Sequence, residues 1–202
     1  MNQEGLISTA KKLDKILKIV QIVNFAVAAA LVCGFLILNI ANWINPENVN
    51  TAERVNVTLG EFILELADVP GAGIDLLYGW VNCIVIVLLL SVLWLGFRYA
   101  RKIMAVMMEG NPFDHSVSEH LKKLSYLTLV YGIVGNAGSW IMTAMKMNHY
   151  QLQRLADGEQ ILSIMPKYQL DLGFLIVFFV FLLASYIFRY GAQLQQLSDE
   201  TL

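Results

Sequence analysis

Charged residues are scarce in this sequence, and so are the residue types that build catalytic and metal sites. Charged side chains make up 15% of the 202 residues, whereas an average soluble domain has about 25%. Hydrophobic residues make up 57%, and the formal net charge is only −2. This composition excludes a disordered chain and a basic domain that binds nucleic acid directly. It indicates that lipid is the main solvent of the protein.

Cysteine and catalytic motifs are also lacking. Cys33 and Cys83, the two cysteines, lie in apolar runs, so we expect small buried side chains without a disulfide. The chain contains no nucleophile elbow, phosphate-binding loop or zinc motif, and no carboxylate pair in an apolar run. His115 and His120 are five residues apart and do not share a helical face, which disfavours a metal site. We therefore predict no enzyme and no cofactor.

Four long stretches contain no charged residue at all. A transmembrane helix needs roughly 20 mostly apolar residues. The stretches predict an all-α, polytopic integral membrane protein with four transmembrane helices, over Ile19–Pro46, Leu76–Phe97, Leu124–Met145 and Leu172–Phe188. The first stretch is longer than a signal-peptide core and lacks a clean A-x-A cleavage site, so we expect it to be retained.

Lysine and arginine are unevenly divided between the loops. Ten of the 14 lie in residues 1–18, 98–123 and 189–202, and the other four in residues 41–75 and 146–171. Loops rich in lysine and arginine stay in the cytoplasm. The division therefore predicts that both termini are cytoplasmic.

Two pairs of similar segments suggest a duplicated hairpin within a single domain, residues 1–202. Lys11-Lys12-Leu13 matches Lys122-Lys123-Leu124, and Phe97-Arg98-Tyr99-Ala100 resembles Phe188-Arg189-Tyr190-Gly191. We predict two tandem hairpins of the same orientation, with repeat one at about 1–109 and repeat two at about 110–202. Chance similarity between apolar helices is the alternative.

Polar and small residues inside the predicted spans are candidates for packing or binding. Asn24, Asn82 and Asn136 would be costly to bury in hydrocarbon without a partner. We expect hydrogen bonds between helices, with a ligand or ion pathway as the alternative. Gly135 and Ser139, four residues apart, predict close approach of another helix, within the bundle or in a homodimer.

The predicted cytoplasmic loop has the most distinctive sequence. Gly110-Asn111-Pro112-Phe113 should end the helix that extends from the second span. Ser116 with Glu119 predicts a capping box at the start of the next helix. The loop is either an ordinary turn, with its phenylalanine packed on the bundle, or part of a docking surface.

Basic residues flank this loop, and a polar tail ends the chain. The basic cluster consists of Arg98, Arg101, Lys102, Lys122 and Lys123. Anionic lipid headgroups are its expected partners, with an acidic protein as the alternative. The residues that we expect at a cytoplasmic interaction surface are Arg98, Arg101, Gly110, Asn111, Pro112, Phe113, Arg189, Gly191, Gln195 and Asp199.

The predicted outer loops contain apolar residues without a long run. Thr58 with Glu61 predicts a second capping box and a short amphipathic helix with Phe62, Ile63 and Leu66 on one side. The second loop has a similar scatter of apolar residues over 152–165. We expect short amphipathic helices that lie on the bilayer or cap the bundle, or that cover an external ligand site.

The four runs, Gly110-x-Pro112-Phe113, and the tail Phe188-Arg189-Tyr190-Gly191-Ala192-Gln193-Leu194-Gln195 then Asp199-Glu200-Thr201-Leu202 carry a family resemblance. The chain resembles the YoaS-like bacterial membrane proteins, catalogued as domain of unknown function 2975. The resemblance implies a bacterial inner-membrane protein, and it supplies no catalytic residues. Genes of that family often neighbour one for a small helix-turn-helix regulator.

Three functional hypotheses follow. The first is a non-enzymatic sensor or regulatory partner of a cytoplasmic factor, such as a helix-turn-helix regulator. The second is a lipid or small-molecule binding or transport component, with its site among the three asparagines and the outer loops. The third is an immunity or assembly scaffold.

Overall fold

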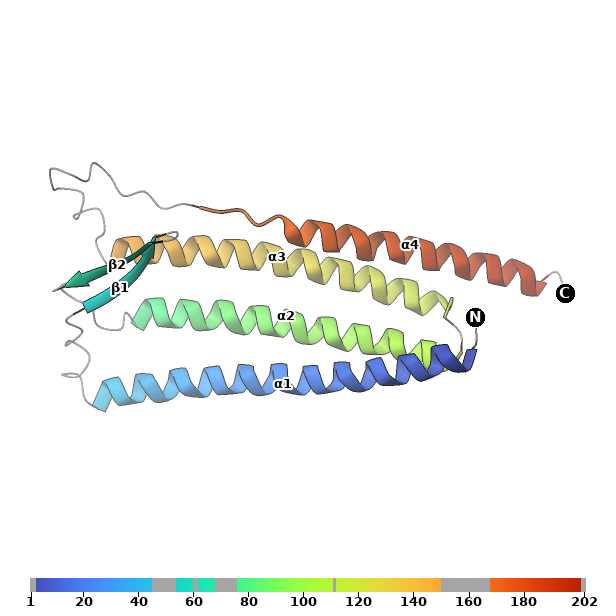
Figure 1. Cartoon of the computed structure of the whole chain (residues 1–202), viewed down its shortest axis with the longest axis horizontal. Coiled ribbons are helices and arrows are strands. Elements are labelled where there is room, and N and C mark those ends of the chain that lie inside the picture. Colours follow the sequence, from blue (N-terminus) through green and yellow to red (C-terminus); the bar gives the residue numbers. More distant parts are fainter. Residues whose placement is uncertain are drawn as a thin grey trace. The chain divides into compact units, whose positions relative to one another are not determined.

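The computed structural model describes residues 3–44, 54–59, 62–67, 76–110, 112–149 and 168–200. These form four long helices and one two-stranded sheet (Figure 1). In chain order the elements are α1 (Gln3–Ile44), β1 (Arg54–Leu59), β2 (Phe62–Ala67), α2 (Leu76–Met108), α3 (His115–His149) and α4 (Gly173–Glu200).

Three of the helices, α1, α2 and α4, are long and apolar enough to cross a membrane. This confirms the prediction of a helical membrane protein. Helix α3 does not reach the same apolarity, because glycine, serine, threonine and asparagine dilute its charge-free run. The span predicted over Leu124–Met145, which lies in α3, therefore stays a prediction.

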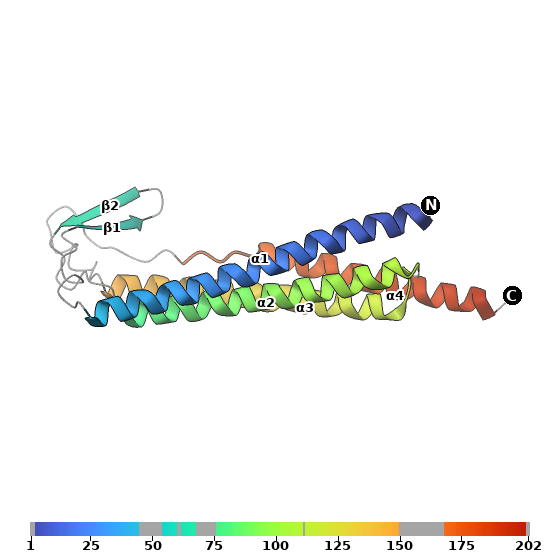
Figure 2. The ribbon, with the colours of Figure 1, turned by 90° about the horizontal axis from the view of Figure 1, so that it is seen from below.

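The helices are longer than the charge-free runs that predicted them. Helix α1 is continuous over 42 residues (Figure 2). At about 1.5 Å per residue it extends roughly 63 Å, about twice the ~30 Å hydrocarbon core of a bilayer. Helix α2 likewise continues past its run to Met108. Most of the basic residues thus lie on helical turns that extend the apolar runs.

The first predicted outer helix is wrong, because a β-hairpin occupies its place. Strands β1 and β2 pair antiparallel, with Val55 opposite Leu66 and Val57 opposite Leu64. The sequence from Arg54 to Leu59 alternates polar and apolar residues, which is the period of a strand, and a glycine follows it. The Thr58/Glu61 pattern therefore does not begin a helix, and Thr58 lies in β1 opposite Ile63 of β2. The apolar residues predicted to be helical at 152–165 lie outside the described residues.

The predicted capping box of α3 is also wrong. The helix begins at His115, and Asp114 is its cap: the backbone N–H of Ser116 donates to Asp114 Oδ1 over 2.7 Å. An aspartate accepts this hydrogen bond as readily as a serine does and adds a negative charge beside the helix N-terminus. Ser116 therefore lies within the first turn of α3.

The chain divides into two compact units, and each is described by itself. The first unit comprises 1–28, 87–135 and 170–202. Its core is formed by Ile103 of α2 with Val117 and Leu121 of α3, all at most 9% exposed. Phe181 and Phe188 of α4 pack against this core.

Helices α3 and α4 run antiparallel within the first unit. Ser185 Oγ of α4 donates to the carbonyl oxygen of Ser118 over 2.8 Å, near the start of α3. About four turns further along, Gly132 of α3 lies so close to Phe174, at the start of α4, that a Cβ on the glycine would collide with the ring. The start of α3 and the end of the apolar run of α4 therefore lie together.

The second unit comprises 29–86 and 136–169. Phe35 of α1 meets Trp80 of α2 edge to face, with ring centroids 4.9 Å apart. Gly138 of α3 lies against Val85, where an added Cβ would be 2.5 Å from a methyl carbon. Cys33 and Cys83 both lie in this unit as free thiols; Cys33 is exposed and Cys83 half-buried.

Candidate functional site

The candidate site lies in the first unit, where the basic residues of α2 and α3 flank the short α2–α3 connection in the chain. Helix α2 ends at Met108, and Gly110 adopts a φ of 82°, a left-handed conformation that glycine enters without steric cost. The N–H of Gly110 donates to the carbonyl oxygen of Met107 over 3.2 Å. The predicted break of the helix at this glycine is confirmed.

The connection packs against α4. A Cβ built on Gly191 would lie 2.5 Å from a ring carbon of Phe113. The Phe113 ring also lies 5.8 Å from the ring of Phe188, centroid to centroid, yet its side chain stays 42% exposed. The structure thus brings together two sequence-predicted residues that lie 78 positions apart in the chain, Phe113 and Gly191.

Arg101 is held by α1 within the same unit. Its Nε donates to Asp14 Oδ1 over 2.9 Å, and its Nη1 donates to Gln21 Oε1 over 3.3 Å. Both charged side chains are half-buried. Arg101 therefore ties α2 to α1 and is not an open docking residue. Asp14 was missed, although it is the one carboxylate among the lysines of residues 11–18 and could have been singled out as their internal partner.

Lysine side chains from two helices, α2 and α3, lie close to the ring of Tyr99. Lys102 Nζ lies 5.5 Å and Lys123 Nζ 5.9 Å from the centre of its ring, and the ring of His120 lies 5.8 Å away. Both distances between a lysine and the ring fall within the range of cation–π attraction. Arg98 contacts Trp94 in the same manner at 5.7 Å and is exposed to solvent.

Among the described residues of this site, His120 is the one with an unsatisfied buried hydrogen-bonding atom. Its Nδ1 atom is buried and has no hydrogen-bond partner. Burial lowers the pKa of the imidazole below its ordinary value of 6.5, and the positive charges of Lys102 and Lys123 lower it further, whereas Glu119 opposes them. The pKa of Asp114 is also lowered, because its carboxylate accepts hydrogen bonds from Ser116.

A polar groove of about 500 Å³ lies between α3 and α4. The residues that line it are His115, Ser118, Glu119, Lys122, Lys123, Tyr126, Ser185, Tyr186 and Arg189. Its volume is typical of small-molecule sites. The groove brings Arg189, predicted as a site residue, beside two lysines of the basic cluster.

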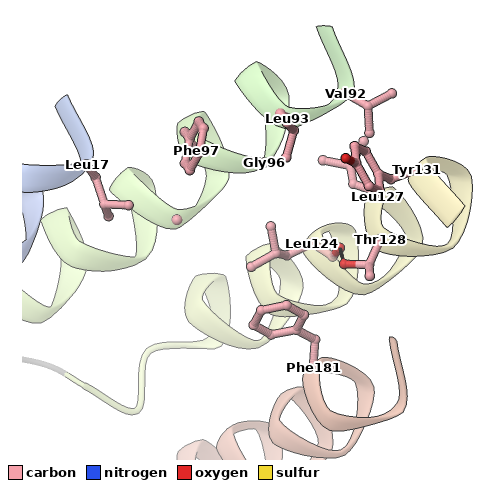
Figure 3. A pocket seen from close by; sticks show the side chains of 11 residues that line it. Leu17, Val92, Leu93, Gly96, Phe97, Leu124, Leu127, Thr128, Tyr131 and Phe181 are labelled. Atoms are coloured by element: carbon pink, nitrogen blue, oxygen red, sulfur yellow. Dashed lines mark hydrogen bonds between the residues drawn. The ribbon is translucent and has the colours of Figure 1, made fainter. Parts of the chain in front are cut away.

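An apolar cavity of about 290 Å³ also lies in the first unit and is lined by residues from all four helices. Figure 3 shows Leu17 of α1, Phe97 of α2, Leu124 of α3 and Phe181 of α4 around it. Among the described residues of its wall, Thr128 and Tyr131 carry hydroxyl groups, and Thr128 donates its own to the carbonyl oxygen of Leu124 over 3.1 Å.

The predicted intramembrane residues lie elsewhere. Asn24, Asn82 and Asn136 are all half-buried, and none of them lines the cavity or the groove. A Cβ on Gly135 would meet nothing within 4 Å, and Ser139 is exposed. The close helix contacts of α3 occur instead at Gly132 and Gly138, where Phe174 and Val85 fill the space above the glycines.

The remaining predicted site residues are distributed as follows. Pro112 is half-buried beside the turn, and Gln195 is exposed on α4. Asn111 and the side chain of Asp199 lie outside the described residues. Within the described part of the chain, no three histidine, cysteine, aspartate or glutamate side chains gather into a metal site.

Comparisons with protein-family models, curated proteins and solved structures give no match for this chain.

Proposed function

We propose that this protein is a non-enzymatic bacterial inner-membrane protein with four spans, and that its cytoplasmic face binds a regulatory partner protein. The contact between Phe113 and Gly191 carries the proposal. Through it the α2–α3 connection and the end of α4 form one continuous surface. Two isolated segments could not offer a partner such a combined surface.

The four-span topology is supported by the antiparallel contact of α3 and α4. Phe113, which precedes α3, lies beside Gly191, which follows the apolar run of α4. If α4 crosses the bilayer, the chain between these two residues must first reach the other side. Helix α3 is the segment of 35 residues that is available for this crossing. Four spans then put both termini in the cytoplasm, in agreement with the distribution of lysine and arginine.

The end of α4 supports a protein partner. Helix α4 continues beyond Arg189 to Glu200 and leaves Tyr190, Leu194 and Leu197 at least 49% exposed. Their spacing of four and three residues gives an apolar stripe, as in helices that dock into a groove of another protein. A small cytoplasmic regulator of the helix-turn-helix type, which the resemblance to the YoaS-like proteins suggests, is the partner that we propose.

A co-purification experiment tests this proposal. The tagged full-length protein is cross-linked in bacterial cells and purified from detergent-solubilised membranes. Bound proteins are identified by mass spectrometry and then tested for binding in purified form. We expect the variant Leu194→Gln/Leu197→Gln to lose the partner and the matched variant Gln193→Ala/Gln196→Ala, on the same helical segment, to keep it. Absence of any specific cytoplasmic protein, or equal loss in both variants, would refute the proposal.

The apolar cavity favours a second candidate function, the binding of a lipid or another small apolar molecule. Its wall consists mainly of aliphatic and aromatic side chains from four helices, and most ligand sites are apolar with few polar groups. Gly96→Leu would place a large side chain at the cavity wall. Reduced retention of a co-purifying apolar molecule by this variant, measured by mass spectrometry, would support this function over the first.

A further inference from the structure

We propose that the groove between α3 and α4 is a specific binding site for the phosphate headgroup of an anionic phospholipid. This inference uses the membrane embedding proposed above and is independent of the regulatory partner. It assigns a ligand to a built surface, whereas the sequence indicated only general attraction between bases and the membrane.

Within the described part of the chain, no ion pair neutralises the two lysines and the arginine of the groove. Among the described residues, the ion pairs join Arg101 to Asp14 and His115 to Glu119, and neither includes Lys122, Lys123 or Arg189. The carboxylate of Glu119 lies 3.6 Å from the imidazole of His115 and is the one acidic group among the described residues of the lining. Three cations against one carboxylate leave a positive site that favours a phosphate.

The floor of the groove holds the two helices at a fixed separation. Ser185 and Ser118 are 6% and 4% exposed, and the hydroxyl of Ser185 donates to the backbone of Ser118 over 2.8 Å. The hydroxyl of Ser118 donates to the carbonyl oxygen of His115 over 2.9 Å. Since both serine protons are used within the protein, the ammonium and guanidinium groups at the rim remain to bind a ligand. A preformed floor lowers the entropic cost of placing these groups.

The position of the groove favours a lipid as the source of the phosphate. Lys123 directly precedes the charge-free run of α3, and Arg189 directly follows that of α4. On the apolar side of these bases Tyr126 and Tyr186 are 49% and 56% exposed, as aromatic residues are at a membrane interface. Leu183 is 63% exposed one turn further into the run and offers a surface for an acyl chain.

The test compares lipids and soluble phosphates on the full-length protein. The detergent-purified chain is titrated with dioleoyl phosphatidylglycerol or dioleoyl phosphatidylcholine, and lipid-bound states are counted by native mass spectrometry. We expect one phosphatidylglycerol to bind in preference. Lys123→Gln/Arg189→Gln should weaken its binding by about 25-fold, roughly fivefold for each base.

Two controls make the result decisive. Lys11→Gln/Lys12→Gln removes the same charge from exposed positions of α1 outside the groove, and we expect less than a threefold change. Circular dichroism should give the same helix content for both variants. Equal weakening by the two variants would overturn the proposal, because it would show general electrostatic attraction. Displacement of the lipid by millimolar glycerol 3-phosphate or inorganic phosphate would overturn it as well, because the site would then take a soluble ligand.

Discussion

At the scale of single residues, burial and two nearby lysines together lower the pKa of His120. Its ring is packed beside Tyr99 and two lysines approach it, while its Nδ1 atom has no partner. The neutral imidazole is therefore the favoured form. The folded protein binds a proton here less tightly than the unfolded chain does.

The pKa of His120 should consequently lie below 6.5 in the folded protein. The stabilising contribution of the neutral ring is complete above the unfolded pKa and declines as the pH falls from there toward the folded pKa. We expect Lys102→Gln to raise the pKa but to leave it below 6.5, because burial is the larger cause. An NMR titration of labelled imidazole carbons measures this, with Lys11→Gln as a control that should change nothing. A wild-type pKa at or above 6.5 would contradict the prediction.

At the scale of helices and strands, the glycines of α3 and α4 differ in what surrounds them. Gly191 lies against the Phe113 ring, whereas a Cβ on Gly135 would meet open space. Alanine forms helix better than glycine by about 1 kcal/mol. The same substitution should therefore have opposite effects at the two positions.

We expect Gly135→Ala to stabilise the protein by up to about 1 kcal/mol. Gly191→Ala should be neutral or destabilising by about 1 to 2 kcal/mol, because the new methyl group displaces the Phe113 ring. In a Phe113→Ala background the Gly191→Ala change should become stabilising, since the obstacle is gone. Thermal unfolding in detergent followed by tryptophan fluorescence provides the comparison. Equal effects of Gly191→Ala in both backgrounds would exclude the contact.

The long helices were predictable and the short elements were not. A charge-free run of 17 or more residues determines a helix through composition alone, so α1, α2 and α4 followed from the sequence. The hairpin at Arg54–Ala67 depended on a choice between two weak local signals. The cap at Asp114 depended on which of two adjacent polar residues accepts one hydrogen bond. Such alternative local structures differ by about 1 kcal/mol in free energy, and the difference depends on geometry that a residue pattern does not contain.

The candidate site was predictable as a region, but its contacts were not. The basic residues and the Gly110–Phe113 loop were predicted to lie in one region because they flank the same connection in the chain. The pairing of Arg101 with Asp14 joins residues 87 positions apart, and that of Phe113 with Gly191 depends on the register of α4. The sequence alone does not fix either register. The groove between α3 and α4 could be recognised only after the antiparallel contact of these helices was known.

At the scale of the whole molecule, the number of spans determines on which side of the membrane the C-terminus lies. Helix α3 is the least apolar of the four, yet its start lies beside the polar end of α4 and its Gly132 beside the opposite end. If the N-terminus is cytoplasmic, as we propose, the C-terminus is cytoplasmic with α3 in the membrane and lies outside without it. The topology thus decides whether Phe113, Gly191 and the basic cluster can share one compartment.

We predict that α3 spans the membrane and that its polar residues are tolerated because neighbouring helices shield them. A C-terminal fusion to green fluorescent protein should fluoresce, and one to alkaline phosphatase should be inactive, because only the first is functional in the cytoplasm. In a Cys33→Ala/Cys83→Ala background, Lys146→Cys should react with a membrane-impermeant maleimide in intact cells. Lys11→Cys should react only after the cells are opened. An active phosphatase fusion together with an unreactive Lys146→Cys would establish three spans, separate Phe113 from Gly191 and remove the basis of the proposed cytoplasmic surface.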